Sequence, residues 1–333
     1  MRIIIPMAGM GKRMRPHTLT VPKPLIPVAG KPIVQWLVED IIHVCKEKVT
    51  EIAFVIGDFG KETEEKLLNI ASAEGAKGKI FYQDEALGTA HAILCAAESM
   101  KDKVIVAFAD TLFRADFTID EEQEGIIWVS KIEDPRAFGV VKVDASNTIT
   151  EFVEKPQQFV SDLAIIGIYY FRDGEYLRSE LQYLIDNNIR DKGEYQLTNA
   201  LENMKKKGTR FVPGKVLEWL DCGNKDATVF TNQRVLAMQK ESNFTAATVK
   251  NQNSMVIQPS FVGESVVLTN SIVGPYASIG AHSVVENSVV SNSIVQNNSR
   301  LKNVVISNSM IGSHVDYSRQ PEELSMGDYS THG

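Results

Sequence analysis

Short apolar runs alternate with segments of helical periodicity along the first third of the chain. Residues 2–7 form an apolar run that predicts a buried strand. Residues 33–45 predict a helix that places Ile33 and Leu37 on one face. The alternation continues with a strand at 51–56, a helix at 61–73, a strand at 79–82, a helix at 89–97 and a strand at 104–109. This order predicts a mainly parallel sheet with helices on both faces.

Sheets of this kind bind ligands at the carboxyl ends of their strands. In this chain those ends are residue 7 onward, residue 83 onward and Asp110. We therefore expect the ligand site to be built from the loops that begin at these three positions.

After about residue 125 the pattern changes to strands with fewer helices. The predicted strands are 139–143, 149–153 and 164–171, and the predicted helices are 176–186, 195–206 and 225–239. Residues 240–253 are polar and follow neither period, which is typical of a linker. We expect a first domain at 1–240, a linker at 241–255 and a second domain with a polar tail at 256–333.

The last third of the chain repeats apolar doublets separated by Gly, Asn and Ser. Examples are residues 270–273, 286–290, 292–295 and 308–311. The doublets recur every five to seven residues, which is typical of a left-handed β-helix with hexapeptide-like turns. Ordinary antiparallel strands are the alternative. A β-helix of three to four coils, at roughly eighteen residues each, favours docking or self-association, so we expect a homo-oligomer.

Composition and charge argue against several classes of protein. A net charge of −7 argues against a sequence-independent nucleic-acid binder, which needs a concentrated basic face. No apolar stretch has the length of a membrane span, and the N-terminus lacks the long apolar core of a secretory signal. The three cysteines are far apart, so we expect free thiols and a cytoplasmic, reducing compartment.

A glycine-rich turn, Ala-Gly-Met-Gly-Lys-Arg at residues 8–13, follows the first strand. A P-loop would need a glycine five residues before Gly11 and a Ser or Thr after Lys12. A dinucleotide-binding turn would need a third glycine where Met14 stands. Since the chain meets neither condition, the turn is expected to bring backbone amides near an anion, or to be an ordinary tight turn.

Lys23 lies between Pro22 and Pro24. The prolines favour an extended segment and a fixed position for the lysine. A rigid lysine near a glycine turn suits a triphosphate whose charge grows on the leaving oxygens. A solvated loop lysine is the alternative.

Eight segments resemble, in the same order, the nucleoside-diphosphate-sugar pyrophosphorylase family of sugar-1-phosphate nucleotidyltransferases, and the resemblance covers about residues 1–240. They are the glycine loop at 9–13, Lys-Pro-Leu-x-Pro at 23–27, Gln-x-x-x-Leu-Gly-Thr-Ala at 83–90, Asp110, Phe-Gly-Val-Val at 138–141, Glu-Lys-Pro at 154–156, Gly-Glu-Tyr-Gln-Leu-Thr at 193–198 and Trp-Leu-Asp-x-Gly at 219–223. Lys12 replaces the family's threonine, and Ala-Asp-Thr at 109–111 replaces its Gly-Asp-Asn or Gly-Asp-His.

The resemblance implies a Rossmann-like nucleotidyltransferase fold and a Mg²⁺-dependent reaction of a nucleoside triphosphate with a sugar 1-phosphate. The implied catalytic residues are Arg13, Lys23, Asp110 and Asp221, of which the two aspartates would hold Mg²⁺, because this hard ion prefers carboxylate oxygens. The implied nucleotide-binding residues are Ala8, Gly9, Gly11, Lys12, Arg13, Gln83, Gly88 and Thr89. The implied sugar-phosphate-binding residues are Gly139, Glu154, Lys155 and Tyr169.

Gln83 is the candidate reader of the base. A side-chain amide offers a donor and an acceptor on adjacent atoms, which complement the carbonyl and N3–H of uracil or thymine. The expected substrates are therefore dTTP or UTP with a hexose 1-phosphate, glucose 1-phosphate first among them. His91, on the following helix, is expected to pack rather than to take part in catalysis.

Two alternatives stay open. One is a guanylyl- or cytidylyltransferase of the same fold. The other is a non-catalytic subunit that senses nucleotide sugars or acts as a scaffold. Such a subunit would be expected to lack Lys23, Asp110 or Asp221, and all three are present.

Overall fold

The computed structural model describes residues 1–239, 244–320 and 322–331. Contacts divide the chain into two compact units, one of Met1–Ile26 with Pro32–Gly223 and one of Pro27–Lys31 with Asn224–Gly333. Part of the predicted linker, residues 241–243, lies outside the described residues. Strand β14 (Lys250–Gln252) lies inside the remainder of that linker. The predicted domain boundaries at 240 and 255 stay a prediction.

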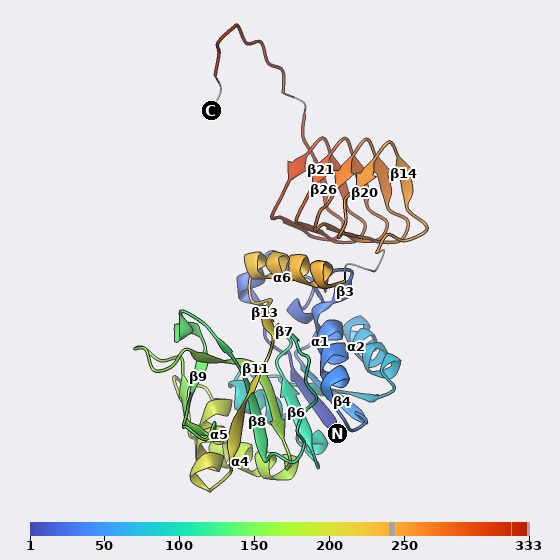
Figure 1. The fold of residues 1–333 in the computed structure, drawn as a ribbon. Coiled ribbons are helices and arrows are strands. Elements are labelled where there is room, and N and C mark those ends of the chain that lie inside the picture. Colours follow the sequence, from blue (N-terminus) through green and yellow to red (C-terminus); the bar gives the residue numbers. More distant parts are fainter. Residues whose placement is uncertain (240–243, 321, 332–333) are drawn as a thin grey trace. The chain divides into compact units, whose positions relative to one another are not determined.

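The first unit is built on a nine-stranded mixed sheet (Figure 1). Its parallel half has the order β5 (Lys77–Tyr82), β4 (Glu51–Ile56), β1 (Arg2–Pro6) and β6 (Val104–Ala107). The other half is mainly antiparallel and contains β11 (Leu163–Phe171), β8 (Gly125–Lys131), β9 (Gly139–Val143) and β10 (Ile149–Glu154), while β12 (Phe211–Lys215) runs parallel to β8. The fold class predicted for this domain is confirmed.

Helices accompany this sheet because their apolar residues recur at helical spacing. They are α1 (Ile33–Val44), α2 (Lys61–Ala73), α3 (Thr89–Leu94), α4 (Gly174–Asp186) and α5 (Leu197–Lys206). Ile3, Ile4 and Ile5 of β1 are fully buried, as expected for a strand that is covered on both faces. Across the described ranges, every helix falls short of the length and apolarity that a membrane span requires.

A small two-stranded ribbon beside the main sheet brings the two predicted aspartates together. Strands β7 (Thr111–Arg114) and β13 (Glu218–Asp221) pair antiparallel, with Asp221 opposite Thr111. The Cys222 N–H donates to the Asp110 carbonyl oxygen at 2.9 Å. This pairing brings together two aspartates that are more than a hundred residues apart in the sequence.

The second unit contains a parallel β-helix with three faces. One face is the five-stranded sheet β14-β17-β20-β23-β26, and each of the other two has four strands. The bounds of the remaining strands are β15 (Met255–Val256), β16 (Phe261–Val262), β17 (Val267–Thr269), β18 (Ile272–Val273), β19 (Ser278–Ile279), β20 (Val284–Glu286), β21 (Val289–Val290), β22 (Ile294–Val295), β23 (Arg300–Lys302), β24 (Val305–Ile306), β25 (Met310–Ile311) and β26 (Asp316–Ser318). The predicted β-helix is therefore confirmed, and the antiparallel alternative is wrong.

Side chains inside and at the corners of the β-helix explain the repeat in the sequence. Its axis is filled by buried aliphatic residues such as Leu268, Val285 and Leu301. At one corner Asn253, Asn270, Asn287 and Asn303 all have positive φ, between 48° and 56°. Their amides form a ladder of side-chain hydrogen bonds of 2.9–3.2 Å across 16 or 17 residues. Asparagine recurs because it tolerates left-handed φ and also bonds to its neighbours.

The segment before the β-helix belongs to the same unit. It contains β2 (Pro27–Val28) and most of the turn to β3 (Lys31–Pro32), as well as helix α6 (Lys225–Met238). The buried Asn232 of α6 accepts from the Ala29 N–H at 2.9 Å and the Ser278 hydroxyl at 2.6 Å, and donates to the Tyr276 carbonyl at 3.2 Å. These bonds connect α6 and the turn at Ala29 to the β-helix within this unit.

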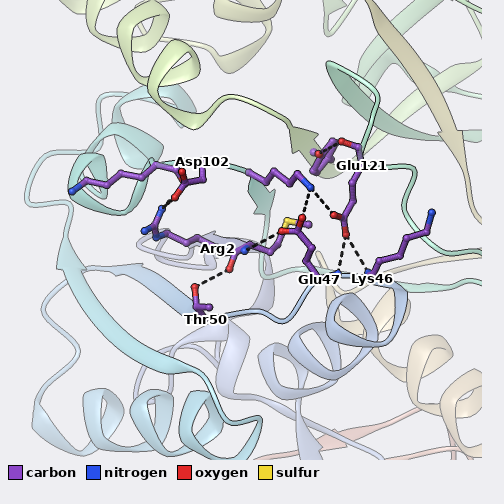
Figure 2. A network of polar contacts seen from close by, with 10 residues as sticks. Arg2, Lys46, Glu47, Thr50, Asp102 and Glu121 are labelled. Atoms are coloured by element: carbon purple, nitrogen blue, oxygen red, sulfur yellow. Dashed lines mark hydrogen bonds and ion pairs between the residues drawn. The ribbon is translucent and has the colours of Figure 1, made fainter.

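An ionic network that includes the buried Glu121 lies at the amino-terminal ends of the parallel strands (Figure 2). The side chain of Glu121 is 7% exposed and accepts from Lys103 at 2.9 Å. It also accepts from the backbone N–H groups of Lys46 at 3.2 Å and Glu47 at 3.0 Å. Burial raises the pKa of Glu121, but the bonds from Lys103 and the two N–H groups outweigh this and leave that pKa below its usual value. The same environment, chiefly through burial, raises the pKa of the Cys45 thiol to about 12.

We expect Glu121→Gln to lower the free energy of unfolding by about 1–3 kcal/mol at pH 7, because the partly exposed Lys103 and the two backbone N–H groups lose a charged acceptor. A carboxyl group whose pKa is lowered on folding contributes stability above its unfolded value of about 4.3, and loses it as the pH falls through the folded value. The difference between wild type and variant should therefore shrink below about pH 4. Urea unfolding at pH 7 and pH 3.5 checks this, with Glu122→Gln at the exposed neighbour as the control. An equal difference at both pH values would contradict it.

Candidate active site

The carboxyl ends of the parallel strands surround a cavity of about 270 Å³. The predicted site residues that line it are Ala8, Gly9, Gly11, Lys23, Gln83, Gly88, Thr89 and Asp110. They come from the loops after β1, β5 and β6, the three strand ends at which the sequence predicts a site. The cavity therefore joins the glycine turn, the lysine, the first aspartate and the base loop.

The glycine turn packs against the segment that carries Lys23. Gly11 has φ +55°, and a Cβ atom there would lie 3.0 Å from Thr18 Cγ2 and 3.1 Å from Lys23 Cβ. The Thr18 hydroxyl donates to the Gly11 carbonyl at 2.8 Å. The prediction of an extended conformation at Lys23 is wrong, because Lys23 begins a single 3₁₀ turn, Lys23–Leu25, in which Pro24 needs no N–H partner.

Lys23 and the two aspartates form one charged cluster. The Lys23 ammonium lies 2.6 Å from Asp110 Oδ2, and the two side chains are only 14% and 32% exposed. Burial, together with the negative charge of Asp110, raises the pKa of Asp221, while the Gly223 N–H, Lys23 and Arg13 lower it. The charges of Asp110, Lys23 and Arg13 therefore all act on the Asp221 carboxylate.

Arg13 reaches this cluster from the glycine turn. A Cβ atom at Gly223 would lie 2.9 Å from Asp221 Oδ2 and 3.2 Å from Arg13 Nη2, so the guanidinium and the carboxylate face the same glycine. Lys12 is exposed, and neither Lys12 nor Arg13 lines the cavity. Of the two basic residues, the structure brings only Arg13 to the aspartates.

The base loop is held by the Gly-Glu-Tyr-Gln-Leu-Thr segment. The Tyr195 N–H donates to the Leu87 carbonyl at 2.8 Å, and the Ala90 N–H donates to the Tyr195 carbonyl at 2.9 Å. Gly88 has φ +114°, and a Cβ atom there would lie 2.5 Å from the Tyr195 carbonyl oxygen. The Thr89 hydroxyl donates to Gln196 Oε1 at 3.1 Å and accepts from the Leu197 N–H at 2.9 Å, so it anchors this segment.

Both the backbone and the side chain of Gln83 make hydrogen bonds. Its backbone N–H donates to the Ile56 carbonyl at 2.8 Å. Its side-chain Nε2 lies 3.3 Å from the Gly88 carbonyl oxygen and 3.1 Å from His91 Nδ1. His91, for which the sequence favours packing over catalysis, makes a polar contact with the candidate reader of the base.

The predicted sugar-phosphate residues form a second group, outside the residues that line the cavity. Glu154 Oε2 accepts from the Thr198 hydroxyl at 3.2 Å, and a Cβ atom at Gly139 would lie 3.2 Å from the same oxygen. Lys155 Nζ lies 3.5 Å from Glu154 Oε1 and is half exposed. Tyr169 is buried, and burial followed by the charge of Glu154 raises the pKa of its hydroxyl.

Two aromatic contacts connect this second group to the first. Phe108, which lines the cavity, meets Tyr169 edge-to-face at a centroid distance of 6.2 Å. Phe138 meets Trp219 edge-to-face at a centroid distance of 5.0 Å. Trp219 lies two residues before Asp221, and Phe138 lies directly before Gly139. The two groups therefore lie at the same edge of the sheet.

Several cavity residues were missing from the sequence prediction of the site. They are Pro6, Met7, Pro24, Ala86, Ala92, Phe108, Ala109 and Glu194. Most are apolar and carry no chemical signature, so only their position marks them. Glu194 stands inside the predicted Gly-Glu-Tyr-Gln-Leu-Thr segment, and that motif was the signal available for it.

The donor set fits a hard divalent cation. Among the described residues, no three His, Cys, Asp or Glu side chains come together as a metal site. Asp110 and Asp221 nevertheless present two neighbouring carboxylates, and Mg²⁺ commonly takes one or two carboxylates and fills its remaining positions with water and substrate phosphate.

The fold and this site define a nucleotidyltransferase. A family model described as "Nucleotidyl transferase" matches residues 2–238, so the chain belongs to the nucleotidyl transferase family. The chain is 28% identical to a glucose-1-phosphate thymidylyltransferase of Streptomyces griseus, over 99% of this chain and 98% of that protein. It is 31% identical to the low-salt glycan biosynthesis nucleotidyltransferase Agl11 of Haloferax volcanii, over 71% of this chain and 66% of that protein.

A solved structure, UDP-glucose pyrophosphorylase complexed with UDP-glucose, is similar with a TM-score of 0.58. The match covers 72% of this chain and 99% of that one, at 23% sequence identity. At this identity the similarity concerns the fold.

Proposed function

We propose that this protein joins dTTP or UTP to a hexose 1-phosphate, glucose 1-phosphate first among them, and releases pyrophosphate. The observation that carries the proposal is the Lys23–Asp110 pair, which lies beside Asp221 and lines the same cavity as the glycine turn and the base loop. The thymidylyltransferase of Streptomyces griseus, similar along nearly its whole length, supports the same reaction class.

The proposed chemistry needs few protein groups. An oxygen of the sugar phosphate, already ionised at neutral pH, attacks the α-phosphorus while the bond to pyrophosphate breaks. No general base is required, so catalysis rests on position and charge. Gly9 and Gly11 would let backbone N–H groups approach the β- and γ-phosphates, and Arg13 and Lys23 would neutralise charge on the departing pyrophosphate.

Asp110 and Asp221 would hold Mg²⁺, which supplies charge that offsets the repulsion between the two phosphates. Glu154 would accept hydrogen bonds from sugar hydroxyls, and Lys155 would bind the sugar phosphate. Tyr169 and Gly139 would form the wall beside Glu154. These roles, and an action in the cytoplasm, are part of the proposal.

The experiment is pyrophosphate release with Mg²⁺, glucose 1-phosphate and a panel of nucleoside triphosphates, followed by a panel of sugar 1-phosphates. The expected result is the highest kcat/KM with dTTP or UTP. A preference for GTP or CTP over both would favour the guanylyl- or cytidylyltransferase alternative. Nucleotide binding without turnover for any sugar phosphate would favour the sensing or scaffold alternative.

The β-helix is proposed to assemble copies of this chain. Met255, Ile272, Val289 and Val305 stand in register on adjacent strands of one face. Met255 is 60% exposed, Ile272 41% and Val305 82%, so the face presents an apolar column to its surroundings. A flat apolar column of this kind is typical of an interaction site rather than of a free surface.

We expect the full-length protein to be an oligomer in solution and Ile272→Lys with Val305→Lys to shift it towards monomer. The reason is that the two new lysine side chains would lose their hydration if the contact formed, and removing an unpaired charge from water is costly. Light scattering after size exclusion checks the mass, and Gln252→Lys, an exposed change on the five-stranded face, is the control. An unchanged mass in the double variant, or a monomeric wild type, would count against the proposal.

A further inference from the structure

The contact between Gln83 and His91 has a definite polarity. The Gly88 carbonyl oxygen can only accept a hydrogen bond, so the nitrogen of the Gln83 amide must face it, at 3.3 Å. The same nitrogen lies 3.1 Å from His91 Nδ1, which must then accept as well. A neutral imidazole that accepts at Nδ1 carries its proton on Nε2. The tautomer of His91 and the orientation of the amide therefore follow from one carbonyl group.

This polarity leaves one polar atom of Gln83 for a ligand. An amide nitrogen has two hydrogens, and Gly88 and His91 take both. The remaining atom is Oε1, an acceptor, on a side chain that lines the cavity. A donor–acceptor pair with the base would require Nε2 to give up one of its two protein partners.

An acceptor that faces N3 of the base separates the pyrimidines. Uracil and thymine offer Oε1 the hydrogen on N3, whereas cytosine offers a second acceptor there and could pair with Oε1 only by shifting so that its 4-amino group takes that position. If the amide turned over, Nε2 would face the base and would suit cytosine instead. The choice between uracil or thymine and cytosine thus depends on which way the amide is held.

We propose that His91 is a positioning residue that sharpens base selectivity, because it acts with the Gly88 carbonyl to hold the Gln83 amide with Oε1 available to the base. The inference rests on the proposed function and on the expectation from the sequence that Gln83 reads the base. His91 lies on the first turn of α3, and its own carbonyl accepts from the Cys95 N–H at 3.0 Å, so the helix fixes the ring's backbone. Gly88 supplies the second anchor of the amide. With His91 removed, the amide would keep one anchor instead of two.

The variants are His91→Phe, which keeps a ring but removes the acceptor, and His91→Asn, whose side-chain oxygen can accept near the position of Nδ1. We measure kcat and KM for UTP and CTP with glucose 1-phosphate, and binding of each nucleotide by calorimetry. In His91→Phe the preference for UTP over CTP should fall by about tenfold, mostly through KM, as expected for the loss of one hydrogen bond that orients the reader. His91→Asn should stay within about threefold of wild type.

The outcomes separate the two proposals. A wild type that binds UTP better than CTP but releases no pyrophosphate overturns the proposed reaction and leaves the binding ratio to test His91. A wild type that binds CTP as well as UTP overturns the role of His91. So does an unchanged ratio in a folded His91→Phe variant, or an equal change in His91→Phe and His91→Asn. His91→Leu replaces the phenylalanine variant if thermal unfolding shows that the larger ring is not accommodated.

Discussion

Asp110→Asn should reduce kcat/KM for pyrophosphate release by about a hundredfold or more, because it removes a charge from the centre of the site. The substitution keeps the size of the side chain but takes away the partner of Lys23 at 2.6 Å and one of two neighbouring carboxylates. The Mg²⁺ concentration needed for half-maximal rate should rise as well. Initial rates over a range of Mg²⁺ concentrations measure both effects, and Asp221→Asn should behave in the same way.

Asp102→Asn is the matched control for this experiment. Asp102 lies just before strand β6 and Asp110 lies after it, so the two aspartates flank opposite ends of one strand. Asp102 also has an ionic partner, Arg2 at 2.9 Å, but its side chain is 80% exposed. We expect nearly unchanged kinetics for this variant. Near-normal rates in both Asp110→Asn and Asp221→Asn would overturn the assignment of the site.

Gly88→Ala should disrupt the base loop. The backbone at Gly88 has φ +114°, and the added Cβ would lie 2.5 Å from the Tyr195 carbonyl oxygen and 2.7 Å from its nitrogen. Neither atom can retreat freely, because each is hydrogen-bonded to the base loop. Backbone strain and overpacking each cost about 1–3 kcal/mol, so we expect a loss of about 2–5 kcal/mol in unfolding free energy, or a rise in KM for the triphosphate of about a hundredfold if the loop moves instead.

Gly193→Ala provides the comparison. Gly193 also has a positive φ, +87°, but a Cβ atom there would meet no heavy atom within 4 Å. This variant has the backbone strain of a positive φ but no steric clash. Its loss of unfolding free energy should therefore be about 1–3 kcal/mol, with the KM for the triphosphate unchanged. Urea unfolding and steady-state kinetics distinguish the two. Equal effects in both variants would show that the contact with Tyr195 is unimportant.

The β-helix and the parallel half of the sheet could be predicted because their signals are local. A strand such as β1 is apolar throughout since both of its faces are covered, and the period of two or 3.6 residues is visible within one element. The Asn and Ser corners of the β-helix repeat because each coil meets the same steric requirement. Boundaries were less accurate. Helix α3 ends at Leu94 rather than at residue 97, and the first described strand of the β-helix starts at Lys250.

The sequence by itself determined the class of chemistry, nucleotidyl transfer, and predicted the groups proposed to carry it: a glycine turn, a lysine between prolines, and aspartates at strand ends. Only the tertiary structure decided how these groups meet. Asp110 and Asp221 become neighbours through the pairing of β7 with β13, and Gln83 acquires its orientation from Gly88 and His91. Such contacts leave no periodic trace, because hydrogen bonds between distant strands, and those of side chains within one loop, depend on sub-ångström placement by the folded chain rather than on residue spacing.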